Sequence, residues 1–170
     1  MTSKADFTPE EWQLLVRAPF EVVMTVSAVG SEGLSRVYDM PIELSTGMKE
    51  LVKLAQQFGE NLIIQNLFTG LEAQEAWLVC AEDQVSQERF PLSKLLQTCQ
   101  EVVDTLDQKA EPAEAQEFKR YLLMVADKVT RAAGGVGGFQ GFGRKQISRV
   151  SPQEAEALKA MAAVLGVTLA

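Results

Sequence analysis

The sequence predicts an all-α protein, a single compact bundle of about seven helices. Three observations lead to this fold class. Apolar residues recur at helical spacing through most of the 170-residue chain, helix start signals occur twice, and no two segments form a convincing pair of strands. An apolar fraction of 46% and this length are enough for one domain, residues 1–170, to bury a core without disulfides or metal ions.

Two helix starts share one arrangement. Thr8-Pro9-Glu10-Glu11 and Ser151-Pro152-Gln153-Glu154 each place a hydroxyl at the N-cap, proline at the first helical position and glutamate at the third. The hydroxyl and the carboxylate satisfy exposed amides reciprocally, and proline loses no hydrogen bond at that position. Both tetrapeptides therefore predict the beginning of a helix.

The first predicted helix runs from Pro9 to about Val29. Pro19 is expected to split or kink it near Ala18, because proline removes a backbone donor and crowds the preceding turn. The second half of this helix is apolar around most of its circumference, which predicts a place at the centre of the core. Its core positions are Phe20, Val22, Val23, Met24, Val26, Ser27 and Val29.

Shorter helices are expected in the middle of the chain. One runs from Ser45 to Phe58 and stops at Gly59, and two more cover residues 61–68 and 72–81. In the Ser45–Phe58 helix the inward residues are expected to be Met48, Leu51, Val52, Ala55 and Phe58.

The second half of the chain has the clearest helical pattern. Helices are predicted from Leu92 to Lys109 and from Pro112 to Ala133, and the short connection between them predicts an antiparallel hairpin. This hairpin should pack on the helix around Phe20–Val29. A last helix is expected from Pro152 to Leu165, ending at Gly166.

Composition excludes several classes of function. The net charge of −7 disfavours a nucleic-acid binder. The absence of histidine excludes Ser-His-Asp and Cys-His nucleophiles and His-ligated metals, so we expect no enzyme, no cofactor and no bound transition metal. Cys80 and Cys99 form no C-x-x-C pair and are expected as buried free thiols. Without a signal-like start or a membrane-length apolar run, the chain is expected in the cytoplasm.

A glycine-rich basic loop, residues 134–150, interrupts the helical pattern. Six of the twelve glycines lie between Gly134 and Gly143, and Arg144-Lys145 follows at once. No acid occurs between Asp127 and Glu154, so the negative charge of the chain lies elsewhere.

This loop admits three interpretations. Its amides and cations could bind phosphate or another small anion, although no P-loop motif is present. Its phenylalanines could contact a protein partner or a membrane surface. It could also be a connector whose phenylalanines fold back on the core. The candidate partner- or anion-binding residues are Arg131, Gly134, Gly135, Gly137, Gly138, Phe139, Phe142, Arg144 and Lys145.

Acidic residues are the other candidate sites. Two clusters at helical spacing are expected to be solvated faces: Asp104 with Asp107, and Glu111 with Glu114 and Glu117. Two isolated carboxylates lie in apolar helical surroundings, where each could ligate a metal or pair with a cation. We favour pairing, with Arg36 or Arg131 as partners of Glu21 and Asp127.

Two stretches, residues 20–58 and 122–165, share a plan of an Ala/Val-rich helix, a glycine break and a polar-started helix. In this the chain resembles the TerB-like (tellurite-resistance-associated) helical domains, whose two halves each carry such a hairpin around an Ala-Asp-Gly-x-Ile-x-x-x-Glu loop associated with divalent metal. The matching segments are Arg131-Ala132-Ala133-Gly134, Ser151 to Leu158, and Ser27-Ala28-Val29-Gly30-Ser31-Glu32. Because Ala133 and Val29 replace the family's aspartate, the resemblance implies the helical fold more than metal binding.

These observations predict a non-enzymatic interaction or adaptor domain of bacterial type. It would contact a protein or surface partner through the basic Gly/Phe loop, with peripheral rather than integral membrane contact. The alternative is a small-anion or divalent-metal-binding domain that uses loop amides and helix carboxylates, with hydrolytic or transfer chemistry built on those carboxylates.

Overall fold

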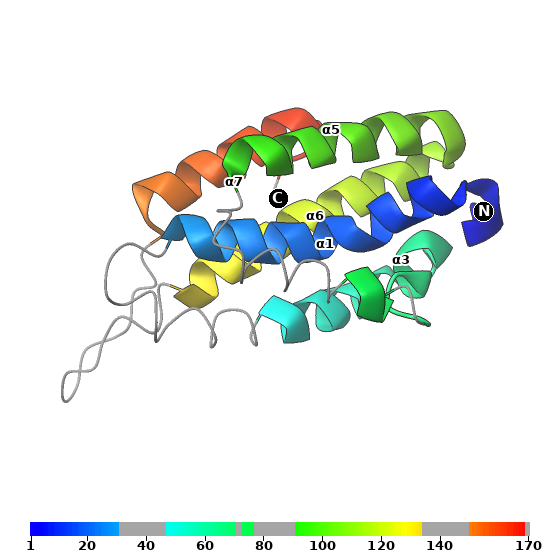
Figure 1. Ribbon diagram of the computed structural model, residues 1–170, viewed down its shortest axis with the longest axis horizontal. Helices are drawn as coiled ribbons and strands as arrows, with labels where there is room; N and C mark the ends of the chain where they lie inside the picture. Colours follow the sequence, from blue (N-terminus) through cyan, green and yellow to red (C-terminus); the bar gives the residue numbers. More distant parts are fainter. Residues whose placement is uncertain (31–46, 71–72, 77–90, 134–149, 169–170) are drawn as a thin grey trace.

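The long helix α1 (Pro9–Gly30) is the centre of the fold. It packs against α5 (Leu92–Lys109), α6 (Pro112–Ala133) and α7 (Pro152–Leu165), and these four helices run along one long axis in Figure 1. The computed structural model describes residues 1–30, 47–70, 73–76, 91–133 and 150–168.

Short helices complete the described part of the chain. They are η1 (Lys4–Asp6), a helix over residues 47–55, η3 (Gln56–Phe58), α3 (Leu62–Asn66) and a turn of helix at residues 73–76. Within the residues described here there are helices and no strand, so the all-α prediction is confirmed. The two pseudo-repeated hairpins stay a prediction, because both stretches include residues outside this part.

Both predicted capping arrangements are formed. The amide of Glu11 donates to Thr8 Oγ1 at 3.3 Å, and the amide of Thr8 donates to a Glu11 carboxylate oxygen at 2.7 Å. At the start of α7 the corresponding distances between Ser151 and Glu154 are 3.2 and 2.7 Å. At its end Gly166 adopts φ +65°, a left-handed conformation that favours glycine and stops the helix.

The expectation that Pro19 splits the first helix is wrong. Helix α1 continues through Pro19 from Pro9 to Gly30. Proline removes one backbone hydrogen bond, but Leu15, Ala18 and Phe20 around it are all buried. Packing against three neighbouring helices therefore holds the helical path despite the missing donor.

The inward face of the 47–58 segment differs from the prediction at two positions. Val52 is 46% exposed, whereas Leu54 is buried. Leu51, Leu54 and Phe58 follow the i, i+3, i+7 spacing of one helix face, and Val52 lies about 100° away from Leu51 around the axis. Met48, Leu51, Val52 and Ala55 also have the spacing of one helix face, so spacing alone could not show that Leu54 rather than Val52 faces the core.

The buried apolar residues form one cluster, and the α5–α6 hairpin supplies much of it. The two helices are antiparallel in Figure 1, as predicted, and both pack on α1. Tyr121 of α6 is buried and donates from its hydroxyl to the carbonyl of Leu51 at 3.1 Å. Its ring also meets Phe58 edge-on, with centroids 5.9 Å apart. These contacts fasten the 47–58 segment to the hairpin.

Candidate functional site

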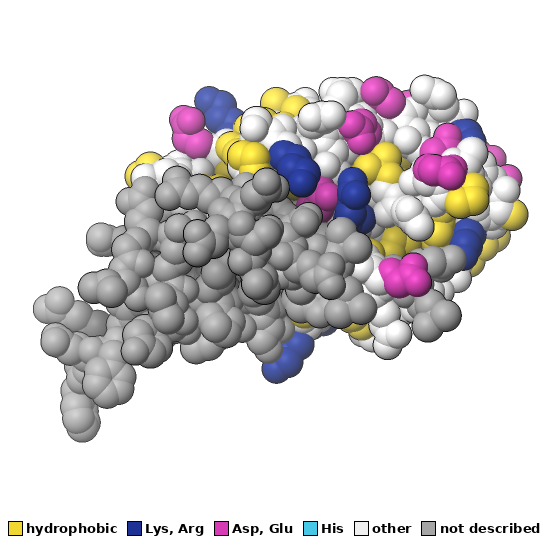
Figure 2. Space-filling view, viewed as in Figure 1, with side chains coloured by type: hydrophobic (Ala, Val, Ile, Leu, Met, Phe, Trp, Pro, Cys, Tyr) yellow, Lys and Arg dark blue, Asp and Glu magenta, His cyan; other side chains and the backbone are white. Residues whose placement is uncertain are grey.

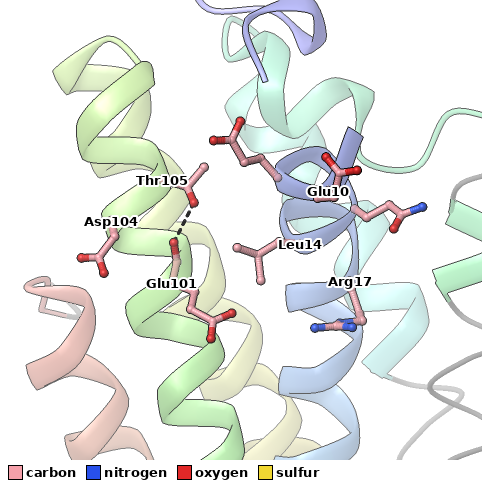
Figure 3. Close-up of a pocket in the computed structure, with 8 residues that line it drawn as sticks. Glu10, Leu14, Arg17, Glu101, Asp104 and Thr105 are labelled. Carbon is pink, nitrogen blue, oxygen red and sulfur yellow. Dashed lines mark hydrogen bonds between the residues drawn. The ribbon is translucent and has the colours of Figure 1, made fainter. Parts of the chain in front are cut away.

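A groove runs between the first half of α1 and the middle of α5. Its volume is about 480 Å³, and Figure 3 shows the residues that line it. From here on it is called the α1–α5 groove. The labelled side chains are Glu10, Leu14 and Arg17 from α1 and Glu101, Asp104 and Thr105 from α5.

The groove has an apolar floor between charged walls. Leu14 lies between the two helices and is partly buried against the core. In Figure 3 the Arg17 guanidinium points toward α5 and the Glu101 carboxylate points toward α1, while Asp104 points away. The Thr105 hydroxyl donates to the backbone carbonyl of Glu101 at 2.8 Å, so it is already occupied within its own helix.

A buried ionic contact fixes the one arginine of the groove. Arg17 Nε lies 2.7 Å from a carboxylate oxygen of Glu21, one turn further along α1. The other carboxylate oxygen of Glu21 accepts a hydrogen bond from the Thr98 hydroxyl of α5 at 2.7 Å. Glu21 is 6% exposed and Arg17 is 42% exposed. The buried carboxylate is therefore paired and the positive charge of Arg17 is balanced within the fold.

The pairing predicted for the two isolated carboxylates is confirmed, with one additional partner. Asp127 pairs with Arg131 at 2.8 Å, as expected. Glu21 pairs with Arg17, and pairing with Arg36 stays a prediction because Arg36 lies outside the described residues. The i, i+4 spacing of Arg17 and Glu21 on one helix was the signal in the sequence that could have identified this pair.

Three carboxylates of the groove have no cationic partner. Glu10, Glu101 and Asp104 are exposed and form no ion pair with any described lysine or arginine. Gln97 and Gln100 donate amide hydrogen bonds to Glu101 and Asp104, which leaves their negative charge in place. Figure 2 shows Asp and Glu side chains gathered over α5 and the adjoining end of α1. The groove is thus an anionic surface.

A fourth carboxylate, Glu11, is already neutralised. It lies 2.6 Å from the ammonium of Lys109. Its hydrogen bonds from Lys109 and then from the amide of Thr8 hold the pKa of Glu11 below its ordinary value. Glu11 therefore ties α1 to the end of α5 and adds little free charge to the groove.

The predicted solvated acidic faces are partly wrong. Asp107 binds the ammonium of Lys119, which is only 4% exposed. Glu114 accepts a hydrogen bond from the amide of Thr2 at 2.7 Å, and Glu117 accepts one from Asn61 Nδ2 at 3.0 Å. Each partner comes from a different element, so spacing along one helix could not show these contacts.

In the described part of the chain, no cluster of ligands supports the alternative of a metal site. Across the described ranges, no three Asp, Glu, Cys or His side chains are close enough to hold a metal ion. Cys99 is a buried free thiol, as expected for that residue. Burial, with a smaller effect from the charge of Glu21, raises its pKa to about 12. Cys80 lies outside the described residues.

Most of the predicted loop site also lies outside the described residues. Arg131 is the exception: it is exposed in the last turn of α6, and its hydrogen bond from Nε to Asp127 raises its pKa. The structure therefore places none of the other candidate loop residues, which are Gly134, Gly135, Gly137, Gly138, Phe139, Phe142, Arg144 and Lys145.

No known protein family, curated protein or solved structure matches this chain. The resemblance to TerB-like domains therefore stays a prediction. Among the described helices, none combines the length and apolar character needed to cross a membrane.

The sequence did not predict the α1–α5 groove. The available signal was small: Leu14 stands among polar residues on the outward side of the first helix.

Proposed function

We propose that this protein is a non-enzymatic interaction domain that holds a basic segment of a partner protein in the α1–α5 groove. The observation that carries the proposal is that Glu10 and Glu101, with Asp104 at the outer rim, border an apolar floor and form no ion pair with any lysine or arginine of the described residues. Complementary charge across an interface directs association and selects among partners. Lysine and arginine side chains on the partner supply that charge.

The internal pairing of the groove supports this choice of partner. Because Arg17 is held by Glu21 and Glu11 by Lys109, neither side chain needs to rearrange when a segment enters. Among the described residues, Glu101 and Asp104 accept hydrogen bonds from glutamine amides, and a cation replaces those contacts at low cost. A partner's alkyl stems would lie on Leu14.

Magnitudes limit how strong these charge contacts are. Exposed ion pairs contribute about 0.2–1 kcal/mol each, so three of them contribute roughly 0.6–3 kcal/mol. A dissociation constant of 1 mM already corresponds to about −4 kcal/mol. The charges alone therefore give weak, salt-sensitive binding, and an apolar contribution is needed for micromolar affinity.

A synthetic peptide tests the proposal. Residues 139–149 of this chain carry Arg144, Lys145 and Arg149 and no acid, so a labelled peptide of that sequence has the required charge. We expect saturable binding by fluorescence anisotropy that weakens as salt is raised. The triple variant Glu10→Gln, Glu101→Gln, Asp104→Asn should weaken it by about threefold to a hundredfold.

A matched variant separates the groove from overall charge. Glu75, Glu111 and Glu156 are exposed acids that do not line the groove. Changing all three to glutamine alters the net charge by the same amount and should leave peptide affinity within about twofold of the unmodified protein. Equal weakening by both triple variants would show general electrostatic attraction and would contradict the groove as the site.

A further inference from the structure

A second hollow adjoins the α1–α5 groove at the start of α1. Its volume is about 560 Å³, within the range of sites that enclose a bulky side chain or small ligand. Its wall is mainly apolar and is formed by Ala5, Phe7, Pro9 and Trp12, with Lys4 at its edge. We call it the Trp12 hollow.

The side chain of Trp12 forms part of the wall of this hollow. This side chain is 2% exposed, and its indole Nε1–H has no hydrogen-bond acceptor. The ring of Phe7 lies beside it, with centroids 6.0 Å apart. The indole nitrogen is fully buried and cannot reach a bound segment, so Trp12 contributes apolar wall to the hollow.

Gln13 joins the two sites. It lines both the α1–α5 groove and the Trp12 hollow, so a single extended segment crossing Gln13 can reach both. Their chemistry differs: the groove offers unpaired carboxylates, whereas the hollow offers aromatic and aliphatic surface. Lys4 also lines the hollow, with its ammonium 5.8 Å from the Trp12 ring centroid.

We propose that the occupant is a protein segment in which a bulky apolar side chain enters the Trp12 hollow and neighbouring lysine or arginine residues lie in the α1–α5 groove. This inference rests on the proposed function. It adds the apolar contact that the charge contacts need to reach micromolar affinity. Buried aromatic anchors flanked by polar contacts are the usual source of affinity in protein interfaces. The opposite character of the two sites also fixes the direction in which the segment lies.

Three versions of the probe peptide separate the two contributions. The parent peptide, residues 139–149, contains Phe139 and Phe142 besides its cations. A second peptide has both phenylalanines changed to alanine, and a third has its lysine and arginines changed to glutamine. We expect the second to bind roughly tenfold to a hundredfold more weakly than the parent, the factor for losing one buried aromatic contact.

The protein side is tested without removing a core residue. Ala5 is exposed and lines the hollow, so Ala5→Phe should fill it while leaving the melting temperature unchanged. We expect Ala5→Phe to reduce the affinity for the parent peptide to that of the alanine peptide, and to leave the alanine peptide's affinity unchanged. In a Trp77→Phe variant Trp12 is the single tryptophan, and its emission should respond to the parent peptide only.

Each outcome decides between the two proposals. Equal affinity for the parent and alanine peptides would overturn the anchor while leaving the charged groove intact. Equal affinity for the parent and glutamine peptides, with no effect of the groove triple variant, would overturn the proposed function itself. Absence of saturable binding by the parent peptide up to millimolar concentration would overturn both.

Discussion

At the scale of single residues, two buried charges of the described residues are each balanced by a specific neighbour. Glu21 is held by Arg17 and Thr98, and the buried ammonium of Lys119 is held by Asp107. A charge buried without such a partner is costly, so these pairs determine which polar substitutions the fold tolerates.

The Lys119 pair gives a first prediction. Asp107→Asn should lower the free energy of unfolding by roughly 2 kcal/mol, because Lys119 is left buried without a counter-charge while the half-exposed site admits some water. Asp104→Asn, one turn earlier and without a cationic partner, should stay within about 0.5 kcal/mol. Urea denaturation measures both. Adding Lys119→Met to Asp107→Asn should restore most of the loss, and a failure to do so would show that charge burial is not the cause.

Cys99 gives a prediction about pH. Burial, with a smaller effect from the charge of Glu21, raises its pKa from 9.0 to about 12, so the folded state keeps its proton where the unfolded chain releases it. The contribution of Cys99 to stability is therefore complete below pH 9 and is lost progressively as pH rises to about 12, by at most about 1.4 kcal/mol per pH unit. Unfolding measured against pH should show a shallower alkaline fall for Cys99→Ala. Buried Tyr121, whose pKa is also raised, acts equally in both proteins.

The same burial predicts low thiol reactivity. In a Cys80→Ser variant, Cys99 should not react with a thiol-specific reagent at about pH 8 until the protein is unfolded. Rapid labelling under native conditions would show that the thiol is accessible, and would contradict the burial on which the raised pKa depends.

At the scale of elements, the sequence predicts helix bounds better than helix faces. The bounds of α5, α6 and α7 agree with the prediction because capping residues, proline and glycine act locally. The split expected at Pro19 and the inward place expected for Val52 are wrong because packing between helices decides both, while a kink at Pro19 stays a prediction. The α1–α5 groove was missed for the same reason: its two walls are far apart in the sequence, and only the fold brings Leu14 beside Glu101.

The substitution Gly47→Ala tests how closely the 47–55 helix packs against α1. A Cβ atom on Gly47 would lie 2.5 Å from Val23 Cγ1 and 3.4 Å from Val129 Cγ2. Gly47→Ala should therefore cost about 1–3 kcal/mol through overpacking. Gly59→Ala, whose nearest contact would be 3.9 Å, should be neutral or slightly stabilising. If adding Val23→Ala to Gly47→Ala recovers no stability in denaturant titrations, close packing at this site is not the cause.

At the scale of the whole molecule, charge is separated along the chain. The net charge is −7, yet no acid occurs between Asp127 and Glu154. Three unpaired carboxylates of the acidic part meet in the α1–α5 groove beside an apolar hollow. The adaptor role expected from the sequence assigned the contact to the glycine-rich loop, whereas the described residues offer a second contact surface of opposite charge. The two surfaces can be tested independently.

The loop is tested by Phe139→Ser combined with Phe142→Ser. If the loop contacts a partner, these side chains are available in the free protein, and we expect the free energy of unfolding to stay within about 0.5 kcal/mol of the unmodified protein. If they are core residues, each removed aromatic should cost roughly 3–5 kcal/mol. Thermal and urea unfolding distinguish the two cases, because the expected losses differ severalfold. A large loss would assign the loop a structural role and leave the α1–α5 groove with the Trp12 hollow as the remaining proposed site.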